Sequence, residues 1–343
     1  MIVNLDKTST TEISKKLVQL RNEVGSMTIG RVMTLVAVCR GEDVEESLHV
    51  AAEATRLHPS RIIALVADPD AADAWLDAEI RLGGDAGASE IIVLRLHGDL
   101  AQHGASALTP LLLADSPVVA WWPMEADENI GETPIGRMAQ RRITDASLSA
   151  DPRSEILRRA MHYTAGDTDM AWARTTRWRG LLAGALDVPP YEPVTKVIVT
   201  GASDSASTDL LGGWLGVELG CPVERRLGEP GLGLISVELE RASGPILLTR
   251  HGEQAILSQP GQPDRQMALQ RPDAVASLAE ELRRLDKDEV YRDALVRGLP
   301  KLAPQRATAP ASLRTGGEIT EAVEPIVDHA FAVELIEAIA GTL

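Results

Sequence analysis

The sequence predicts an α/β protein of two domains, with a mostly buried N-terminal sheet flanked by helices and a smaller C-terminal α/β or α+β domain. A length of 343 residues suggests about two domains of roughly 150 residues each. Nearly continuous apolar runs such as Val32 to Cys39 are typical of strands that are covered on both faces. Segments with helical spacing of apolar residues alternate with these runs, which is the α/β order.

The first hundred residues predict alternating helices and strands. A helix begins at Thr10 or Thr11 and runs to Glu23, because Ile13, Leu17 and Leu20 recur at helical spacing. The elements expected after it are a strand at 32–39, a helix at 41–56, a strand at 62–67, a pair of strands at 75–82 and 89–96 with a glycine-rich turn between them, and a short helix at 99–107.

The next segment predicts a strand at 118–122, a loop at 130–142 and helices at 151–165 and 169–185. Gly131 and Gly136 in this loop have the spacing of a phosphate-binding loop. Arg137 and a methionine follow instead of Lys-Ser/Thr, and Pro134 removes a loop amide. A P-loop NTPase is therefore rejected.

A proline cluster at Pro189, Pro190 and Pro193 marks the expected end of the first domain. The predicted domains are 1–188 and 189–300, followed by a linker and amphipathic tail helix at 301–343. The second domain is expected to contain a strand at 194–200, a helix ending at 219, an antiparallel meander of strands at 234–240, 245–250 and 254–258, and helices at 273–285 and 287–298.

No cofactor is expected. The segment after the strand at 194–200 reads GASDSAS, and serine, threonine or aspartate stands where a dinucleotide-binding pattern requires further glycines. The two cysteines, Cys39 and Cys221, lie far apart without CxxC spacing, so neither a metal site nor a thioredoxin-type motif is predicted. Both are expected to be small buried residues.

Composition limits the partners and the compartment. A net charge of −16 argues against binding to nucleic acid or to an anionic membrane, since both require a clustered basic surface. No apolar run approaches the ~20 residues of a transmembrane helix, and the N-terminus lacks the pattern of a secretory signal. We therefore expect a cytoplasmic protein.

Tryptophan and arginine concentrate at 169–185, and this segment is the first candidate binding site. Trp178 is expected to point inward, with Trp172 and Arg179 at the edge of the helix. Arg174 falls within the apolar face, where it must extend to solvent, pair with a carboxylate, or reach an anion or a partner chain. A core helix whose tryptophans fill space remains the alternative.

A second tryptophan pair, Trp121 and Trp122, ends the strand at 118–122. Adjacent strand residues point to opposite faces, so one ring is expected in the core while its neighbour can face outward. The alternative is that both rings lie in the core.

His58, Ser60 and Arg61 lie at a helix-to-strand junction and form a third candidate site. Together these side chains could bind a phosphate or a partner's carboxylate. The alternative is a turn whose polar side chains satisfy local backbone groups.

Linear catalytic motifs are missing. The sequence contains no GxSxG nucleophile elbow, HExxH zinc helix, kinase set or EF-hand loop. This lowers the expectation of an enzyme, although an active site assembled from distant residues has no linear motif.

Three motifs in order resemble the glucose-6-phosphate dehydrogenase assembly protein (OpcA) family. They are HPSR at 58–61, the AWWP ending of 111–123, and DMAWAR at 169–174 with the following Trp178-Arg179. The resemblance covers about residues 1–304, and the acidic composition is similar to that of actinobacterial proteins. It implies a non-enzymatic, cytoplasmic partner that binds the first dehydrogenase of the pentose phosphate pathway and promotes its assembly or activity. Members of the family in photosynthetic bacteria are tied to redox regulation of this dehydrogenase. The two isolated cysteines of this chain do not support such a switch here.

The resemblance and the residue types lead to one hypothesis and one rival. In the hypothesis, an allosteric activator binds the dehydrogenase through a patch of Trp121 or Trp122, Trp172, Arg174, Trp178 and Arg179, because Trp and Arg dominate protein interfaces. The rival is a sugar-phosphate-binding α/β protein or enzyme in which His58, Ser60, Arg61, Arg174 and Arg179 converge on a phosphate.

Overall fold

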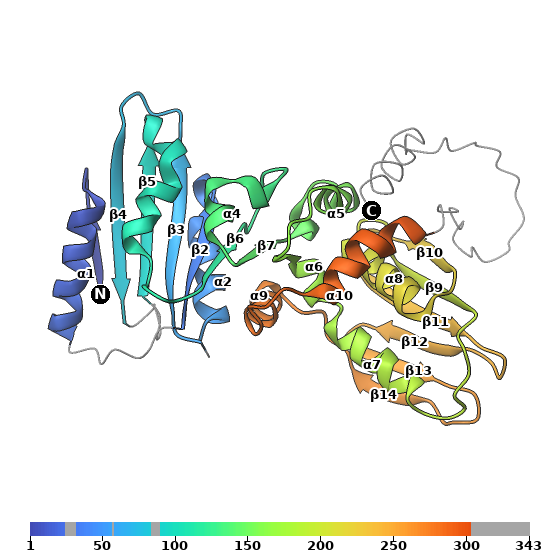
Figure 1. Cartoon of the computed structure of the whole chain (residues 1–343). Coiled ribbons are helices and arrows are strands. Elements are labelled where there is room, and N and C mark those ends of the chain that lie inside the picture. The colour runs from blue at the N-terminus through green and yellow to red at the C-terminus, as the bar shows by residue number, and fades with distance from the viewer. Residues whose placement is uncertain (25–31, 57, 84–89, 303–343) are drawn as a thin grey trace, which may run out of the picture. The chain divides into compact units, whose positions relative to one another are not determined.

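The computed structural model describes residues 1–24, 32–56, 58–83 and 90–302 (Figure 1). They form two compact units whose segments interleave along the chain. The first unit comprises Met1–Pro152, His162–Thr176 and Arg271–Glu289, and the second comprises Arg153–Met161, Arg177–Gln270 and the described residues from Val290 onward. The α/β class and the presence of two sheets confirm the predicted architecture.

The first unit is built on an eight-stranded sheet with the strand order β1-β4-β5-β3-β2-β6-β7-β8. The strands are β1 (Ile2–Leu5), β2 (Met33–Cys39), β3 (Ser60–Asp68), β4 (Trp75–Leu82), β5 (Glu90–His97), β6 (Val118–Trp121), β7 (Arg141–Thr144) and β8 (Asp167–Asp169). Strands β5, β3, β2, β6, β7 and β8 are parallel, whereas β1 and β4 pair antiparallel at one edge. The chain moves outward from β2 in one direction and later from β6 in the other, so the sheet is doubly wound with its switch point between β2 and β6.

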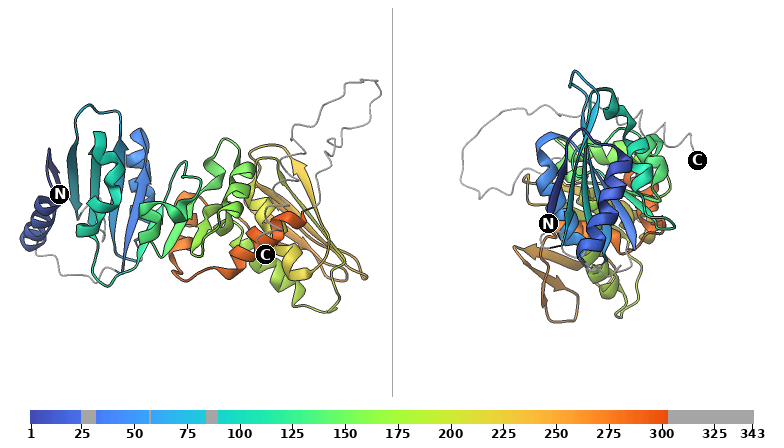
Figure 2. Two further views of the ribbon diagram at one scale, coloured as in Figure 1. Left: turned by 45° about the horizontal axis from the view of Figure 1, so that its top comes forward. Right: turned by 90° about the vertical axis from the view of Figure 1, so that its left-hand side faces the viewer.

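Helices cover both faces of this sheet (Figure 2). One face packs against α2 and α9, and the other against α1 and α3. This two-sided cover explains the uninterrupted apolar runs of β2 and β3. The helices of the unit are α1 (Thr10–Val24), α2 (Val44–Ala54), α3 (Gly104–Leu108), α4 (Pro134–Met138), α6 (Met170–Ala173) and α9 (Ala274–Leu282).

Trp121 and Trp122 lie on opposite faces of the sheet, and each belongs to the core of its own face. Both side chains are 2% exposed, so the expectation that one of them faces outward is wrong. The reason is the helical layer on each side, because a residue at either face of a doubly covered strand is buried.

The second unit contains a six-stranded sheet with the order β10-β9-β11-β12-β13-β14. Strands β9 and β10 are parallel, and helix α8 connects them along the chain. The remaining pairs are antiparallel, which confirms the predicted meander. The elements are α5 (Pro152–Met161), α7 (Thr176–Leu186), β9 (Lys196–Ala202), α8 (Ala206–Leu219), β10 (Val223–Gly228), β11 (Leu234–Glu240), β12 (Ile246–His251), β13 (Gln254–Ser258), β14 (Arg265–Ala268), α10 (Glu289–Arg292) and a π-helical stretch Asp293–Gly298.

Among the described residues, the hydrophobic core of the second unit lies on one face of its sheet. Helices α7 and α8 contribute Trp178, Leu182 and Leu215 to this core, together with the inward residues of the strands. The alternating burial along β11 and β12 is that of a sheet with one covered and one open face.

The helix predicted at 169–185 is two helices. Asp169 ends β8 and caps α6, the amide of Thr175 donates to the carbonyl of Trp172, and α7 begins at Thr176. The break lets the two halves pack in different cores, with Met170 in the first unit and Trp178 in the second.

The loop predicted at 130–142 contains α4 and the buried strand β7. Gly136 is the second of the two glycines that have the phosphate-loop spacing. Its amide donates to the hydroxyl of the cap residue Thr133, and a Cβ at this glycine would lie 1.8 Å from the carbonyl oxygen of Ile130. The glycine is therefore required by tight helix packing.

The compact units divide the chain differently from the domain limits expected at 188 and 300. Residues 177–186 pack in the core of the second unit, and Arg271–Glu289 belongs to the first. The tail helix predicted within 301–343 lies outside the described residues, which end at 302. Among the described helices, none has both the length and the apolar content that crossing a bilayer requires.

Candidate functional site

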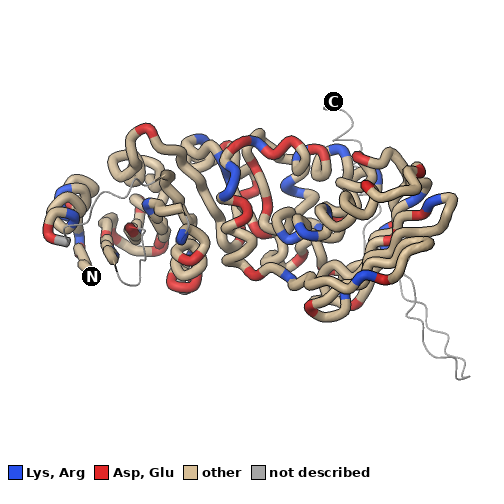
Figure 3. Tube along the Cα trace, turned by 90° about the horizontal axis from the view of Figure 1, so that it is seen from below, with Lys and Arg blue, Asp and Glu red and all other residues tan. Residues whose placement is uncertain are grey.

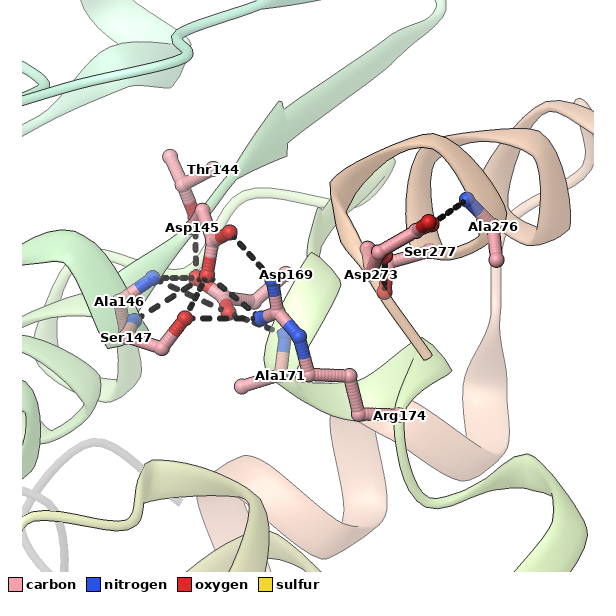
Figure 4. Close-up of polar contacts among 10 residues, drawn as sticks. All are labelled: Thr144, Asp145, Ala146, Ser147, Asp169, Ala171, Arg174, Asp273, Ala276 and Ser277. Carbon is pink, nitrogen blue, oxygen red and sulfur yellow. Dashed lines mark hydrogen bonds and ion pairs between the residues drawn. The ribbon is translucent and has the colours of Figure 1, made fainter. Parts of the chain in front are cut away.

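Two neighbouring parallel strands of the first unit, β7 and β8, end in aspartates whose side chains meet (Figure 4). Asp145 directly follows β7, and Asp169 is the last residue of β8. The carboxyl ends of parallel strands are where α/β sheets usually carry their functional groups. This cluster is therefore the first place to look for a site.

Asp169 is fully buried and accepts hydrogen bonds from three donors. The Thr144 hydroxyl donates at 2.6 Å, and the backbone amides of Ala146 and Ala171 donate at 3.0 and 2.8 Å. The Ala171 bond is the N-cap of α6. Asp169 thus joins the ends of both strands to the start of a helix.

Arg174 forms an ion pair with Asp145. Its two terminal nitrogens each lie 2.7 Å from a different oxygen of Asp145, which is the bidentate geometry that Arg and carboxylate prefer. The guanidinium also donates to the Ser147 hydroxyl at 2.9 Å. Of the alternatives open for Arg174, the structure selects pairing with a carboxylate of its own chain.

Asp145 also closes the turn that follows β7. It accepts from the amide of Ser147 at 3.1 Å and from its hydroxyl at 2.5 Å, and so caps the 3₁₀ turn Ala146–Leu148. Leu148, the last residue of this turn, is 54% exposed. A buried ion pair therefore supports a turn that presents an apolar side chain to solvent.

The two carboxylates of the cluster have different electrostatic environments. Burial, followed by the nearby charge of Asp145, raises the pKa of Asp169 to about 6 despite its three hydrogen bonds. Burial alone would lower the pKa of Arg174, but the hydrogen bonds and charge of Asp145, with Asp169 and Asp273, raise it above its usual value. The arginine is thus held charged, whereas Asp169 titrates near neutrality.

A second buried ion pair attaches helix α9 to the same strands. Glu281 accepts from Arg141 at 2.5 Å and from the Thr168 hydroxyl at 2.8 Å, and Arg141 also donates to the carbonyl of Asp286 at 2.7 Å. Burial raises the pKa of Glu281, although Arg141 opposes the shift. These contacts hold the segment Arg271–Glu289 in the first unit.

Trp172 strengthens the same attachment. Its side chain is buried, and its indole Nε1 donates to Asp288 at 2.9 Å. Sequence reasoning missed Asp145, Glu281 and Asp288, because single acidic residues in an acidic chain carry no pattern. The one available signal was the arginine inside an apolar face, which requires an anion nearby.

The other predicted binding residues are divided between the units. Trp172 and Arg174 belong to the first unit, whereas Trp178 and Arg179 belong to the second. Trp178 is buried as predicted, and Arg179 is half-buried. Since Trp121, Trp122 and Trp172 are also buried, these rings stabilise the fold rather than offering a surface to a partner.

The HPSR residues form local contacts. Ser60 is buried and its hydroxyl donates to the carbonyl of His58 at 2.7 Å. Arg61 is buried and pairs with Glu90 at 2.8 Å, and Glu90 also accepts from Arg21 at 2.9 Å. These contacts favour the turn over the anion-binding interpretation, because the guanidinium of Arg61 is already held by a buried carboxylate.

The switch point between β2 and β6 does not have the features of a dinucleotide site. The turn after β2, Gly41–Asp43, holds a single glycine. Helix α2 begins with Asp43, Glu45 and Glu46, whose charges oppose a pyrophosphate at the helix N-terminus. Within the described part of the chain, no group of three or more His, Cys, Asp or Glu side chains is placed to hold a metal ion.

Comparisons with known proteins match both units. The family model described as the glucose-6-phosphate dehydrogenase subunit N-terminal domain matches residues 51–161, and the model of its C-terminal domain matches residues 165–295. A search of curated proteins gives no match. The crystal structure of GenD2 from gentamicin A biosynthesis in complex with NAD is 13% identical, with 81% of this chain and 94% of that chain covered and a TM-score of 0.34.

Proposed function

The chain belongs to the glucose-6-phosphate dehydrogenase assembly protein (OpcA) family, and from this premise we propose that it binds glucose-6-phosphate dehydrogenase and promotes the assembly or activity of that enzyme. The observation that carries the proposal is that the two family models together match residues 51–161 and 165–295, and so include segments of both compact units. We propose further that the chain acts as a non-enzymatic partner. The acidic start of α2 supports this part, because it disfavours a cofactor phosphate at the switch point.

We assign partner binding to the part of the first unit formed by α6 and the neighbouring turn Ala146–Leu148. Here Leu148 is exposed on a short turn, and Asp145 fixes that turn by capping it and by pairing with Arg174. A preorganised surface loses less conformational entropy on association than a mobile one. In this assignment Arg174 and Trp172 are positioning residues, and Leu148 is the contact.

Activation of the dehydrogenase requires preferential binding. A partner shifts an equilibrium between two forms of an enzyme only by as much as its affinities for those forms differ. A tenfold preference for the active oligomer corresponds to about 1.4 kcal/mol. One well-buried aliphatic contact contributes about 1.5–3 kcal/mol, so a single residue such as Leu148 is enough to matter.

The test is to measure the affinity for the dehydrogenase after Leu148→Glu. This substitution changes an exposed side chain, so the fold is expected to remain while affinity falls at least tenfold. The matched control is Val18→Glu, which places the same charge at a 55% exposed aliphatic position on α1. Equal affinity of both variants and the unaltered chain would remove Leu148 from the interface. No binding by the unaltered chain would overturn the proposed function itself.

A further inference from the structure

The second sheet has an open face that no helix among the described residues of its unit covers (Figure 2). Helices α7 and α8 pack on the opposite face, where Ile246 and Leu248 of β12 are buried. Leu247, between them in sequence, is 36% exposed on the open face. Because neighbouring strand residues alternate between faces, the composition of the open face can be assigned from the strand register.

Half of this face has no charge. On β12, β13 and β14, Thr249 pairs with Ile256, which pairs with Gln266, and Leu247 pairs with Ser258. Gln254 belongs to the same face, and His251 lies at the hairpin end. Figure 3 shows these strands largely without Lys, Arg, Asp or Glu along their length. We call this surface the uncharged half, defined by Leu247, Thr249, Gln254, Ile256, Ser258 and Gln266.

The other half of the face carries charges of both signs, among them Glu238 of β11, which pairs in register with Leu247 of β12. On β9 and β10, Lys196 lies 2.6 Å from Glu224, which also pairs with Arg226 at 2.7 Å. Solvent-facing sides of antiparallel sheets are normally polar and charged. An uncharged area bordered by charged residues is instead the composition of a protein interface, whose centre is depleted in charge and whose rim is polar.

We propose that the open face of the second sheet is the surface on which two copies of this chain associate. The net charge of −16 makes two copies repel one another over most of their surfaces. The uncharged half is where two copies can approach without placing acid against acid. An isologous dimer brings the same patch of each copy together, and a patch without net charge is complementary to itself.

The size of the face fits a reversible dimer. Six strands at about 4.8 Å spacing and some six residues at about 3.3 Å each span roughly 600 Å² in plane, before the roughness of the side chains is added. A standard interface buries about 800 Å² per partner. The proposed dimer is therefore near the lower end of stable interfaces.

Sedimentation velocity on the full chain tests this inference between about 1 and 100 µM, a range that covers weak dimers. The unaltered chain is expected to be a concentration-dependent dimer. Leu247→Glu and Thr249→Glu are each expected to raise the dissociation constant at least tenfold, because each places two carboxylates at the centre of the interface. Raising the salt concentration is expected to strengthen the dimer by screening the repulsion between the copies.

The matched control is Val290→Glu, an exposed aliphatic position on α10 of the same unit. Its dimer is expected to have an unchanged dissociation constant. Circular dichroism and thermal melting verify that each variant is folded. A chain that is monomeric throughout the range, or a dimer that both sheet variants leave intact, overturns the proposal. Loss of dehydrogenase binding by the sheet variants of a monomeric chain would show that the face belongs to the enzyme instead.

Discussion

At the scale of single residues, Asp145 and Asp169 show how two neighbouring buried carboxylates are stabilised in different ways, one by an arginine and one by neutral donors. Arg174 forms its bidentate pair with Asp145, while Asp169 is stabilised by a hydroxyl and two amides. An ion pair of this kind is costly to break, because removing one partner leaves an uncompensated buried charge. The cluster therefore fixes the turn that carries Leu148.

The raised pKa of Asp169 predicts a pH dependence of stability. The pKa is about 6 in the folded chain and has an ordinary value of 3.8, so the folded state binds the proton more tightly than the unfolded state. The contribution of this group to the free energy of unfolding is complete below about pH 4 and is lost as the pH rises through 6. The difference between these two pKa values corresponds to an upper limit of about 3 kcal/mol of unfolding free energy.

Urea unfolding between about pH 4 and pH 7, the interval set by the two pKa values, measures this effect. The free energy of unfolding is expected to fall by about 1–3 kcal/mol more for the unaltered chain than for Asp169→Asn. Asp187→Asn, at an exposed position, is the control and should follow the unaltered chain. If the curves of all three proteins are parallel, the assignment of the titrating group to Asp169 is wrong.

The pairing of Arg61 with Glu90 predicts weak recognition of sugar phosphates. A phosphate would have to compete with a buried carboxylate for this guanidinium. In a thermal-shift titration without the dehydrogenase, glucose 6-phosphate and 6-phosphogluconate are expected to leave the melting temperature unchanged. Saturable stabilisation by either compound, abolished in Arg61→Ala, would support the phosphate-binding alternative.

At the scale of elements, the sequence was sufficient to predict a helix or strand wherever the pattern that specifies it is local. The apolar runs of β2 and β3, the spacing of Ile13, Leu17 and Leu20 in α1, and the meander β11 to β13 were all predicted correctly. Strand β7 was missed because its sequence RRIT contains two arginines, and their burial depends on Glu281 and Asp167 far along the chain. Long-range partners of this kind have no local signature.

The break between α6 and α7 was missed for a related reason. Residues 169–185 have continuous helical spacing, but the two halves pack against different cores, and Thr175 closes the first half. The candidate site was predicted only in part. The sequence singled out Trp172 and Arg174, but it did not supply Asp145 or Glu281, nor could it tell that the tryptophans are buried.

Helix α9 offers a direct comparison of a buried and an exposed ion pair. Glu281→Gln removes the anion that compensates Arg141, and the expected loss is about 3 kcal/mol of unfolding free energy. Glu280→Gln, at the adjacent position, breaks only the exposed pair with Arg283 and should cost less than about 0.5 kcal/mol. Chemical denaturation of both variants provides the measurement. Equal losses would contradict the role assigned to the Arg141–Glu281 pair.

At the scale of the whole molecule, the two units differ in construction. The first is a doubly wound sheet with tightly paired charges at the ends of β7 and β8, and the second is an open-faced sheet with an uncharged half. The family matches include segments of both units. We propose that the first unit binds the dehydrogenase and that the second mediates self-association.

We propose that this chain binds glucose-6-phosphate dehydrogenase and favours its active assembly. The most direct measurement is the mass distribution of the purified dehydrogenase by light scattering, with and without the full chain, together with its activity in the same samples. We expect a stable complex, a larger share of the enzyme in its active oligomer and a higher specific activity. An enzyme whose mass and activity are both unchanged by saturating amounts of the chain would contradict the account.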